Sequence, residues 1–428
     1  MRKNLAPRSA DGYTILSRGF VLITSADFLV RSAYQMGKSP LLPIYAAALG
    51  AGDIFLGFIV SVSTLTGMVL KPTFGVLSDR SGRRLWLIIG TAFFVGMPFV
   101  YRFVSSPEQL FAVRMIHGLA TAIYGPVTLA YVTELSTKQR AERIGWFSIA
   151  RNAGYVVGPA VAGWMLLTIE PVSVFTIVGL LSGLAFLPVI FLPETVDNPN
   201  NNTKSDHLGQ KSDRLTFKKQ VTMALSAGAI APAVWIAGIL DANIFITVYA
   251  VKAFVPLLAL SSGANVAVAG AFLAIQEAVH IATNPIGGKL SDRFGFVNMA
   301  ISGMVVLGGA LVLLPHLAMD IAMILPAALI GFAQALVFPS TMALVSKQVD
   351  ASHLATSIGL VGSMKNAGKV LGPVIAGLMI HWLDYTYTFI VMGSMLLIGA
   401  AIIWYLLQKR APIGRITNSN FKTYDPTE

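Results

Sequence analysis

The fold of this chain is decided by Gly75-Val76-Leu77-Ser78-Asp79-Arg80-Ser81-Gly82, a segment that returns 213 positions later as Gly288-Lys289-Leu290-Ser291-Asp292-Arg293-Phe294-Gly295. Self-similarity at a fixed offset is the signature of an internal structural repeat. The offset is about half of the 428 residues. The sequence therefore predicts two homologous halves.

Further matches at an offset of 213 or 214 lie around these segments. The first half contains Arg151-Asn152-Ala153-Gly154 followed by Gly158-Pro159, which returns as Lys365-Asn366-Ala367-Gly368 followed by Gly372-Pro373. Single residues also recur: Gly118 as Gly331, Pro126 as Pro339, Asp27 as Asp241, and Lys38 as Lys252. Chance does not explain so many matches in corresponding places.

The composition places both halves in a membrane. Hydrophobic residues make up 55% of the chain, charged residues only 12%, and the mean hydropathy is +0.70. A soluble domain carries roughly 25% charged residues, so this chain has too few to cover a water-exposed surface. This excludes a soluble enzyme, a nucleic-acid-binding module and a disordered regulator, and it predicts a protein that crosses the bilayer several times.

Twelve segments are apolar and long enough to span a bilayer, which takes about 20 residues each. They are expected at 19–47, 53–74, 85–104, 108–132, 145–169, 172–192, 231–259, 265–286, 297–316, 321–346, 355–381 and 386–407. The predicted fold is an all-α membrane protein with 12 transmembrane helices in two pseudo-symmetric six-helix bundles. Residues 1–192 are expected to form the N-terminal bundle, 193–220 a cytoplasmic linker, and 221–428 the C-terminal bundle with a short cytoplasmic tail.

The loop charges give an orientation. Basic residues gather on one side of the predicted membrane, at Arg80, Arg83, Arg84, Lys138, Arg140, Arg143, Lys289, Arg293 and Lys347. Because Lys and Arg concentrate in cytoplasmic loops, both termini are expected in the cytoplasm, and the net charge of +11 needs no nucleic-acid partner. The first apolar run is typical of a transmembrane helix rather than a cleavable signal peptide, so a prokaryotic cytoplasmic (inner) membrane is the expected location.

Several motifs carry a family resemblance. The loop Gly75-x-Leu77-x-Asp79-Arg80-x-Gly82-Arg83-Arg84 resembles the signature of the major facilitator superfamily, and Arg114, His117 and Gly118 resemble its fourth-helix motif. Gly154-x-x-x-Gly158-Pro159-x-x-Ala162-Gly163 resembles the antiporter motif of the 12-helix drug:proton branch, although that motif usually ends Gly-Gly. The resemblance covers nearly the whole chain. It implies a proton-coupled transporter, with Arg114 implicated in the coupling.

The repeated loop has the composition of a cytoplasmic gate. Its glycines permit a tight turn, and Asp79 can pair with a basic residue or accept hydrogen bonds from a helix N-terminus. Ion pairs that form only when the cytoplasmic side is closed would bias the protein between two states. The predicted gate residues are Gly75, Asp79, Arg80, Gly82, Arg83, Asp292 and Arg293. Simple anchoring by the arginines is the alternative, but it gives the repeated aspartate and glycines no role.

The glycine–proline motifs have a packing explanation that requires no ligand. Small residues at a spacing of four form a groove for a neighbouring helix, and proline bends a helix. The predicted packing residues are Gly154, Gly158, Pro159, Gly368, Gly372 and Pro373.

Ionisable side chains inside the predicted spans indicate the substrate site. Each costs at least about 2.5–3.5 kcal/mol in a bilayer, so it is expected to face a cavity or a partner. One helix face of the first span carries Asp27, Arg31, Tyr34 and Lys38, and the seventh span carries Asp241, Tyr249 and Lys252. The residues predicted to line the substrate cavity are Arg31, Tyr34, Lys38, Arg151, Tyr249, Lys252, His280 and Lys365.

The balance of deep charges predicts the charge of the substrate. There are six cations, Arg31, Lys38, Arg114, Arg151, Lys252 and Lys365, against three acids, Asp27, Asp241 and Glu277. This excess indicates an anionic or carboxylate-bearing substrate.

Proton coupling requires a carboxylate whose pKa can move through the working pH. Asp27 is the candidate in the first half, with Arg114 as its expected partner, and Asp241 and Glu277 are the candidates in the second. A structural ion pair between Asp27 and Arg31, four residues apart on one helix, is the alternative.

The sequence thus predicts a secondary active transporter, not an enzyme, that exports a small organic molecule in exchange for protons by alternating access. The expected partners are a small-molecule substrate, protons and the lipid bilayer, with no nucleic acid, and the chain is expected to be a monomer. With no cysteine and 6 scattered histidines, no metal or other cofactor is expected. An organic-anion or carboxylate-siderophore carrier, for export or uptake, is the alternative; from other classes, a lipid scramblase or a non-transporting membrane sensor remains open.

Overall fold

The computed structural model describes residues 18–135, 140–194, 232–317, 321–349 and 351–410. The predicted linker from residue 195 onward lies outside the described residues, as does the predicted tail after residue 410. The described residues form helices joined by short connections, and none of them belongs to a β-strand.

The first half begins with α1 and ends, among the described residues, with α8. Its helices are α1 (Arg18–Lys38), α2 (Leu41–Ala48), α3 (Asp53–Ser81), α4 (Arg83–Val100), α5 (Pro107–Glu134), α6 (Arg140–Met165), α7 (Pro171–Gly183) and α8 (Phe186–Ile190). The second half contains α10 (Pro232–Ser261), α11 (Val266–Phe294), α12 (Phe296–Leu313), α13 (Ile324–Gln348) and α14 (Ala351–Arg410). Helix α14 changes direction at Asp384, whose φ of 70° and ψ of 177° are not helical.

Nine helical stretches within the described ranges are long and apolar enough to cross a membrane. One of them is Ser357–Leu406 of α14, whose 50 residues on either side of the bend at Asp384 cover the last two predicted spans. Helices α1 and α6 are not among the nine. Both carry ionisable residues, Asp27 and Arg31 in α1 and Arg151 in α6, which lower their mean hydropathy. Each predicted span falls largely on described helices.

The two copies of the repeated loop make the same turn. Gly82 separates α3 from α4 with a φ of 95°, and Gly295 separates α11 from α12 with a φ of 91°. Glycine adopts this left-handed region without the steric cost that a Cβ brings. The structure therefore uses glycine at both positions for the same backbone reason.

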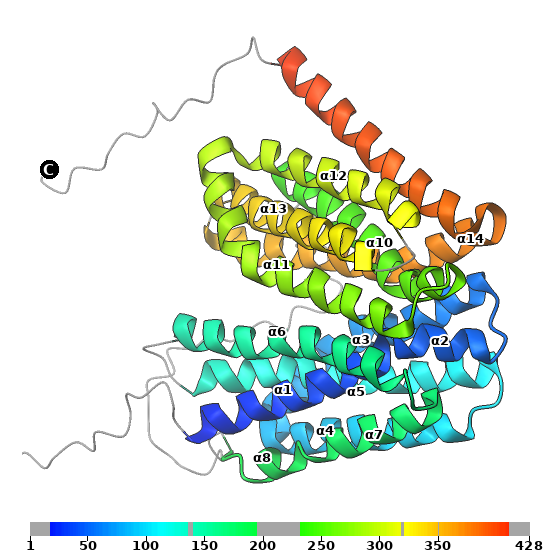
Figure 1. The fold of residues 1–428 in the computed structure, drawn as a ribbon. Coiled ribbons are helices and arrows are strands. Elements are labelled where there is room, and N and C mark those ends of the chain that lie inside the picture. Colours follow the sequence, from blue (N-terminus) through cyan, green and yellow to red (C-terminus); the bar gives the residue numbers. More distant parts are fainter. Residues whose placement is uncertain (1–17, 136–139, 195–231, 318–320, 350, 411–428) are drawn as a thin grey trace, which may run out of the picture.

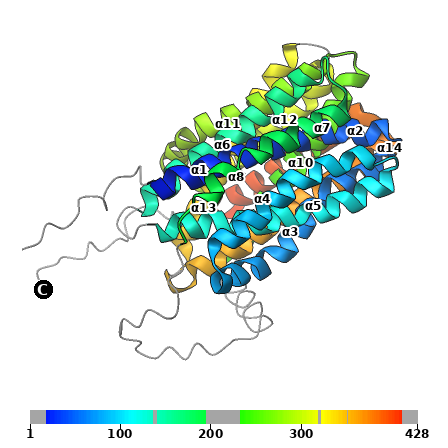
Figure 2. The same cartoon turned by 90° about the horizontal axis from the view of Figure 1, so that it is seen from below.

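Helices α1–α8 gather in one part of the molecule and α10–α14 in the other (Figure 1). Within the first part, α1 packs on α6 and α3 packs on α5; within the second, the corresponding pairs are α10 with α14 and α11 with α13. The repeat in the sequence is thus matched by a repeat in helix packing. Figure 2 shows the long helices of both parts running in roughly the same direction.

The predicted packing residues lie at two closely packed pairs of helices. A Cβ on Gly158 of α6 would lie 2.7 Å from the carbonyl oxygen of Ser32 in α1. A Cβ on Gly372 of α14 would lie 2.2 Å from the carbonyl oxygen of Ile246 in α10. The same two pairs contain Gly154 against α1 and Gly368 against α10.

Two glycines bring the halves together. A Cβ on Gly57 of α3 would lie 2.3 Å from the carbonyl oxygen of Pro373 in α14. A Cβ on Gly270 of α11 would lie 2.6 Å from the carbonyl oxygen of Pro159 in α6. Gly57 and Gly270 are 213 positions apart, so both contacts between the halves use the same repeated residues.

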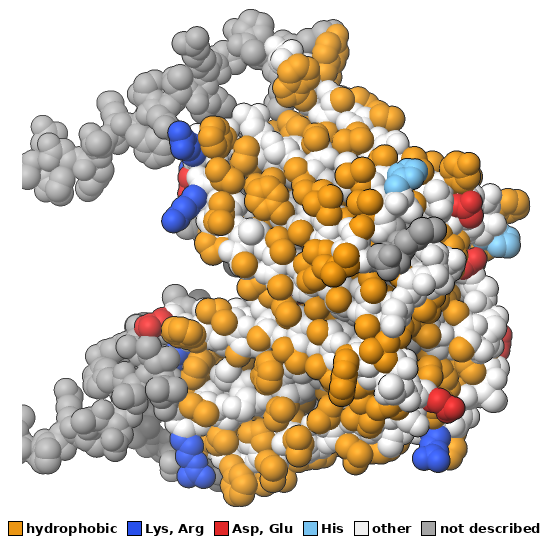
Figure 3. Space-filling model, viewed as in Figure 1, with side chains coloured by type: hydrophobic (Ala, Val, Ile, Leu, Met, Phe, Trp, Pro, Cys, Tyr) orange, Lys and Arg blue, Asp and Glu red, His pale blue; other side chains and the backbone are white. Residues whose placement is uncertain are grey.

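The halves are joined at one end and separated at the other. At the joined end, the hydroxyl of Tyr385 donates a hydrogen bond of 3.0 Å to Asp53 Oδ1. Buried apolar residues such as Ile59 and Val251 belong to one core that crosses this junction. At the end where α1 begins, Figure 3 shows the surface hollowed between the halves. Among the described residues, the halves are therefore apart at the end where α1 begins and in contact at the end that contains Asp53 and Tyr385.

Candidate functional site

A cavity of ≈ 800 Å³, its solvent-open part included, lies between the halves. Small-molecule sites usually measure about 300–1,000 Å³. The cavity is lined by Arg31, Tyr34, Gln35, Lys38, Ser39, Thr64, Lys71, Thr121, Tyr155, Pro159, Tyr249, Lys252, Leu273, Glu277, Asn366 and Lys369. Apart from Ser39, which follows α1, these residues come from α1, α3, α5 and α6 of the first half and from α10, α11 and α14 of the second.

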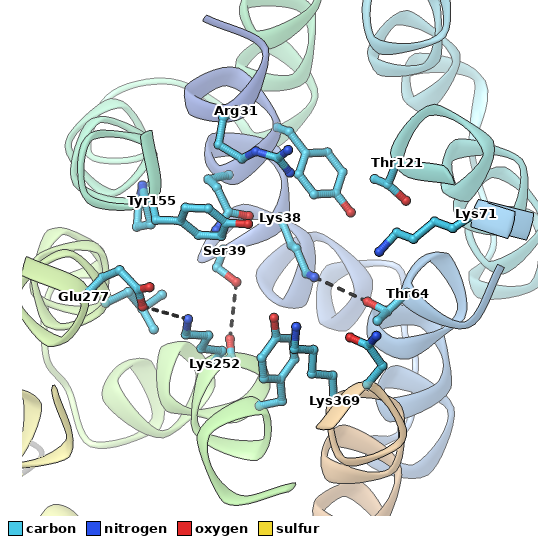
Figure 4. A pocket seen from close by; sticks show the side chains of 16 residues that line it. Arg31, Lys38, Ser39, Thr64, Lys71, Thr121, Tyr155, Lys252, Glu277 and Lys369 are labelled. Carbon is cyan, nitrogen blue, oxygen red and sulfur yellow. Dashed lines mark hydrogen bonds and ion pairs between the residues drawn. The ribbon is translucent and has the colours of Figure 1, made fainter. Parts of the chain in front are cut away.

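The lining is cationic. Its basic residues are Arg31, Lys38, Lys71, Lys252 and Lys369, and Glu277 is the one acidic residue in it. Figure 4 shows Lys38, Lys71 and Lys369 extending from three different helices toward the same space. An anionic ligand in this space would meet several ammonium groups together.

Lys252 is neutralised within the cavity wall. Its Nζ atom lies 3.0 Å from Glu277 Oε2, and His280 Nδ1 lies 3.7 Å from Glu277 Oε1. Lys252 is therefore half of an ion pair that joins α10 to α11.

Lys38 has no such partner among the residues that the structure describes. Its Nζ atom donates a long hydrogen bond of 3.5 Å to Thr64 Oγ1 and lies 5.3 Å from the centre of the Tyr249 ring. Thr64 and Glu277 are 213 positions apart, so they occupy corresponding places in the repeat. A threonine cannot neutralise an ammonium group, which leaves the positive charge of Lys38 available.

Lys71 and Lys369 extend the same positive region. Lys71 is exposed, whereas Lys369 is half-buried with Nζ 5.0 Å from the centre of the Phe245 ring. Within the described part of the chain, neither lysine forms an ion pair.

Asp27 is held behind the cavity by two arginines. Its side chain is 1% exposed and accepts hydrogen bonds of 2.9 and 3.0 Å from Arg151, while Arg31 lies 3.7 Å away. Arg151 also donates to Thr128 Oγ1 at 2.9 Å. The prediction that Asp27 pairs with Arg114 is wrong, because Arg151 reaches the carboxylate from α6 with both of its paired donors.

Arg114 lies in a separate polar cluster. It is 1% exposed and donates hydrogen bonds to the hydroxyl groups of Tyr101, at 3.3 Å, and Ser63. The Tyr101 hydroxyl lies 3.0 Å from His117 Nδ1. None of the carboxylates in the described ranges forms an ion pair with Arg114.

Asp241, the counterpart of Asp27, has a different environment. One carboxylate oxygen accepts a hydrogen bond of 2.8 Å from Thr341, and the other has no hydrogen-bond partner among the described residues. The counterpart of Arg151 is Lys365, whose Nζ lies 4.5 Å from the centre of the Phe245 ring and forms no ion pair within the described ranges.

The charges of the first loop copy pair within the first half. Arg83 forms an ion pair with Asp79, and its Nη2 lies 2.7 Å from Glu134 Oε1 at the end of α5. Its backbone N–H donates to Glu194 Oε1 at 2.9 Å. Of the other predicted gate residues, Arg80, Asp292 and Arg293 are exposed and Gly75 is half-buried.

The structure separates the predicted cavity residues into two groups. Arg31, Tyr34, Lys38, Tyr249 and Lys252 line the cavity. The other three, Arg151, His280 and Lys365, lie outside this lining. Arg151 donates hydrogen bonds to Asp27, His280 lies beside Glu277, and Lys365 lies over the rings of Phe245 and Phe338. The prediction that Arg151, His280 and Lys365 line the cavity is therefore corrected.

The lining residues that the sequence reasoning missed include two lysines and a tyrosine: Lys71, Lys369 and Tyr155. Lys71 lies within the span predicted at 53–74 and Lys369 within the span at 355–381. The rule that flags ionisable residues inside spans would therefore have found both lysines.

The family model described as Major Facilitator Superfamily matches residues 28–253 and 240–423. The chain belongs to the Major Facilitator Superfamily. It is accordingly an integral membrane protein and a transporter. Members of this superfamily contain internal repeats and bind substrate at the interface between them, which is where the cavity lies.

Two of the relatives are named for drug resistance. The chain is 25% identical over 373 residues to Multidrug resistance protein 1 of Bacillus subtilis (strain 168), covering 85% of this chain and 90% of that protein. It is 29% identical over 167 residues to Quinolone resistance protein NorA of Staphylococcus aureus, covering 39% of this chain and 42% of that protein. The chain thus resembles the drug:proton antiporter branch.

Solved structures show the same fold at low sequence identity. A mutant form of the nucleoside transporter NupG superimposes with a TM-score of 0.74 and 15% identity, over 90% of this chain and 99% of that chain. A bacterial homologue of the human lysosomal transporter Spinster, solved in an inward-facing and unoccupied conformation, gives a TM-score of 0.68 and 17% identity, over 94% of this chain and 98% of that chain.

Proposed function

We propose that this transporter exports a small organic anion in exchange for protons, by alternating access between two pseudo-symmetric bundles of six transmembrane helices. The observation that carries the proposal is the cavity between the halves, where five basic residues face one acid. Unpaired charges inside a membrane protein mark substrate and ion pathways. An excess of cations there favours an anionic, for example carboxylate-bearing, substrate.

In an exporter, the open end of the cavity is where the substrate enters. With the basic loops and both termini on the cytoplasmic side of an inner membrane, the hollow in Figure 3 faces the cytoplasm. A substrate would enter from there. The other state would open the end now held by Tyr385 and Asp53, and close the end near the Asp79 and Arg83 loop.

The second half offers the better proton sites. Glu277 lies in the cavity wall, where its pairing with Lys252 can change when a substrate or a proton arrives. Asp241 is 1% exposed and has one unpartnered oxygen among the described residues, so a proton there would remove an incompletely compensated charge. Asp27 is held by Arg151 and Arg31, which supports a structural role for it.

Transport by the purified monomer in proteoliposomes tests this proposal. Benzenesulfonate is a suitable probe because it stays ionised, so neither leakage of a neutral acid nor its own titration affects the result. We expect it to accumulate in an acidified lumen and to leave when an uncoupler removes the pH gradient. Glu277→Gln should lose accumulation but retain exchange of labelled for unlabelled probe. Accumulation that is independent of the pH gradient would contradict proton coupling.

Export of lipophilic cations is the second candidate, because two relatives are named for multidrug and quinolone resistance. Tetraphenylphosphonium distinguishes the two in the same assay. Its accumulation without that of benzenesulfonate would contradict the anion proposal and favour multidrug export.

A further inference from the structure

The repeat shows which cavity lysine is available to a ligand. Lys38 and Lys252 occupy corresponding places in α1 and α10. Lys252 has an ionic partner at 3.0 Å, whereas the contacts of Lys38 with described residues are to neutral groups, the Thr64 hydroxyl at 3.5 Å and tyrosine rings. The same scaffold therefore carries a compensated cation on one side of the cavity and an uncompensated cation on the other.

Two further cations face the same space as Lys38. Lys71 enters from α3 and Lys369 from α14, and Figure 4 shows their side chains extending toward that of Lys38. None of the three forms an ion pair with any residue that the structure describes. Like charges that share a space repel one another. A ligand with a single negative charge would leave two positive charges of this group uncompensated, whereas a dianion would leave one.

The remaining lining suits the frame of an organic molecule. The rings of Tyr34, Tyr155 and Tyr249 and the side chain of Leu273 lie in the wall, and Asn366 adds a neutral amide. Pockets that combine apolar surface with a few polar groups orient ligands that have an apolar body and polar ends.

We propose that the cavity binds an organic dianion, whose two acidic groups are held by the ammonium groups of Lys38, Lys71 and Lys369 while its frame lies against the tyrosines. This inference rests on the proposed function. It adds to that function the number of negative charges on the substrate, and it assigns substrate binding to Lys71 and Lys369. Dicarboxylates and other compounds with two acidic groups share this chemistry.

Calorimetric titration of the purified protein with two probes tests the inference. Benzene-1,3-disulfonate and benzenesulfonate share a frame and a type of acidic group, but they carry two charges and one. A charge-assisted hydrogen bond is worth enough to make the disulfonate bind about tenfold more tightly or better. Lys71→Gln and Lys369→Gln should each reduce that preference, and Lys71→Arg should preserve it. Lys289→Gln is the matched control, because Lys289 is exposed and lies outside the cavity lining.

Other outcomes of these titrations would contradict either the dianion inference alone or the proposed function as well. Equal affinity for the two probes, or a preference that survives both glutamine variants in folded protein, would overturn the dianion inference. If benzenesulfonate still moves with the pH gradient in that case, the proposed function stands. If neither sulfonate binds or moves, both the inference and the anion proposal are wrong.

Discussion

The two halves share one framework but place their acids differently. In the first half, Asp27 is fully paired with Arg151 and the cavity lysine, Lys38, faces a threonine. In the second half, the cavity lysine is paired with Glu277, while Asp241 has one hydrogen bond from Thr341. The repeat therefore conserves the backbone positions, whereas the residues at corresponding positions differ and have different roles in the two halves. The first half offers two of the three lysines proposed to bind the substrate, Lys38 and Lys71, and the second half adds Lys369 and offers carboxylates to protons.

The largest expected effect is the loss of stability when the first-half pair is broken. Arg151→Gln leaves a carboxylate that is 1% exposed without its main partner, and breaking a buried ion pair costs about 3–5 kcal/mol. Lys365→Gln, at the corresponding position, should cost about 1 kcal/mol, since no ion pair is lost. Thermal unfolding in detergent checks the contrast.

A double variant separates charge from packing. Asp27→Asn combined with Arg151→Gln removes both charges and should recover part of the stability lost in Arg151→Gln. Equal losses of stability for Arg151→Gln and Lys365→Gln would show that the two halves do not differ in the pairing of these buried aspartates.

The next largest effect is a change of conformation when the contact between Gly57 and Pro373, which joins the two halves, is disturbed. Gly57→Ala places a Cβ against the backbone of Pro373, and overpacking of this kind costs about 1–3 kcal/mol. It should favour the state in which this end is apart and the opposite end is closed. Because the chain has no cysteine, spin labels at Ser81→Cys and Phe294→Cys can report the distance across the open end.

That distance should become shorter in Gly57→Ala and remain unchanged in Gly96→Ala, whose Cβ would meet no atom within 4 Å. An unchanged distance in both variants would mean that the Gly57 contact does not control the state.

A smaller effect, on ligand binding, is expected when Lys38 is given an acidic partner like the one that Lys252 has. Thr64→Glu gives Lys38 the partner that Glu277 gives Lys252, so it should weaken binding of benzene-1,3-disulfonate about tenfold. Thr64→Gln has nearly the same size without the charge and should bind almost as well as the native protein. Calorimetry measures both. Equal weakening by glutamine and glutamate would assign the effect to volume.

The smallest effect is expected in the gate. Asp79 is 57% exposed, and Arg83 keeps Glu134 when Asp79 is replaced. Exposed ion pairs contribute about 0–1 kcal/mol, so Asp79→Asn should hardly change thermal unfolding. Arg83→Gln, which loses both partners, should lower the unfolding temperature measurably. A large loss in Asp79→Asn would show that this pair stabilises the open state itself.

The sequence predicted the helices and their repeat better than it predicted the partners of the charges. Apolar length locates a helix, and the repeat aligns Gly82 with Gly295 without any knowledge of packing. Which cation reaches Asp27 depends on how α1, α5 and α6 cross, and the spacing of residues along one chain does not contain that information. Only the neighbour at four residues, Arg31, could be placed near Asp27 in advance.

The cavity residues show the same limit. The stripe of Arg31, Tyr34 and Lys38 follows from helix periodicity within α1. Lys71 and Lys369 belong to helices that meet α1 only in the folded protein, so their approach to Lys38 could be found only from the structure.

The proposed roles of the two halves are tested most directly by transport of benzene-1,3-disulfonate in proteoliposomes. Accumulation driven by a pH gradient and exchange of labelled for unlabelled probe are measured in parallel for the native protein, Thr64→Glu and Glu277→Gln. The account predicts that Thr64→Glu reduces both activities together at low probe concentration, because the charge of Lys38, one of the three lysines of the anion site, is neutralised. Glu277→Gln should keep exchange but lose the response to pH. The opposite pattern, with exchange lost in Glu277→Gln and pH-driven accumulation intact in Thr64→Glu, would contradict it.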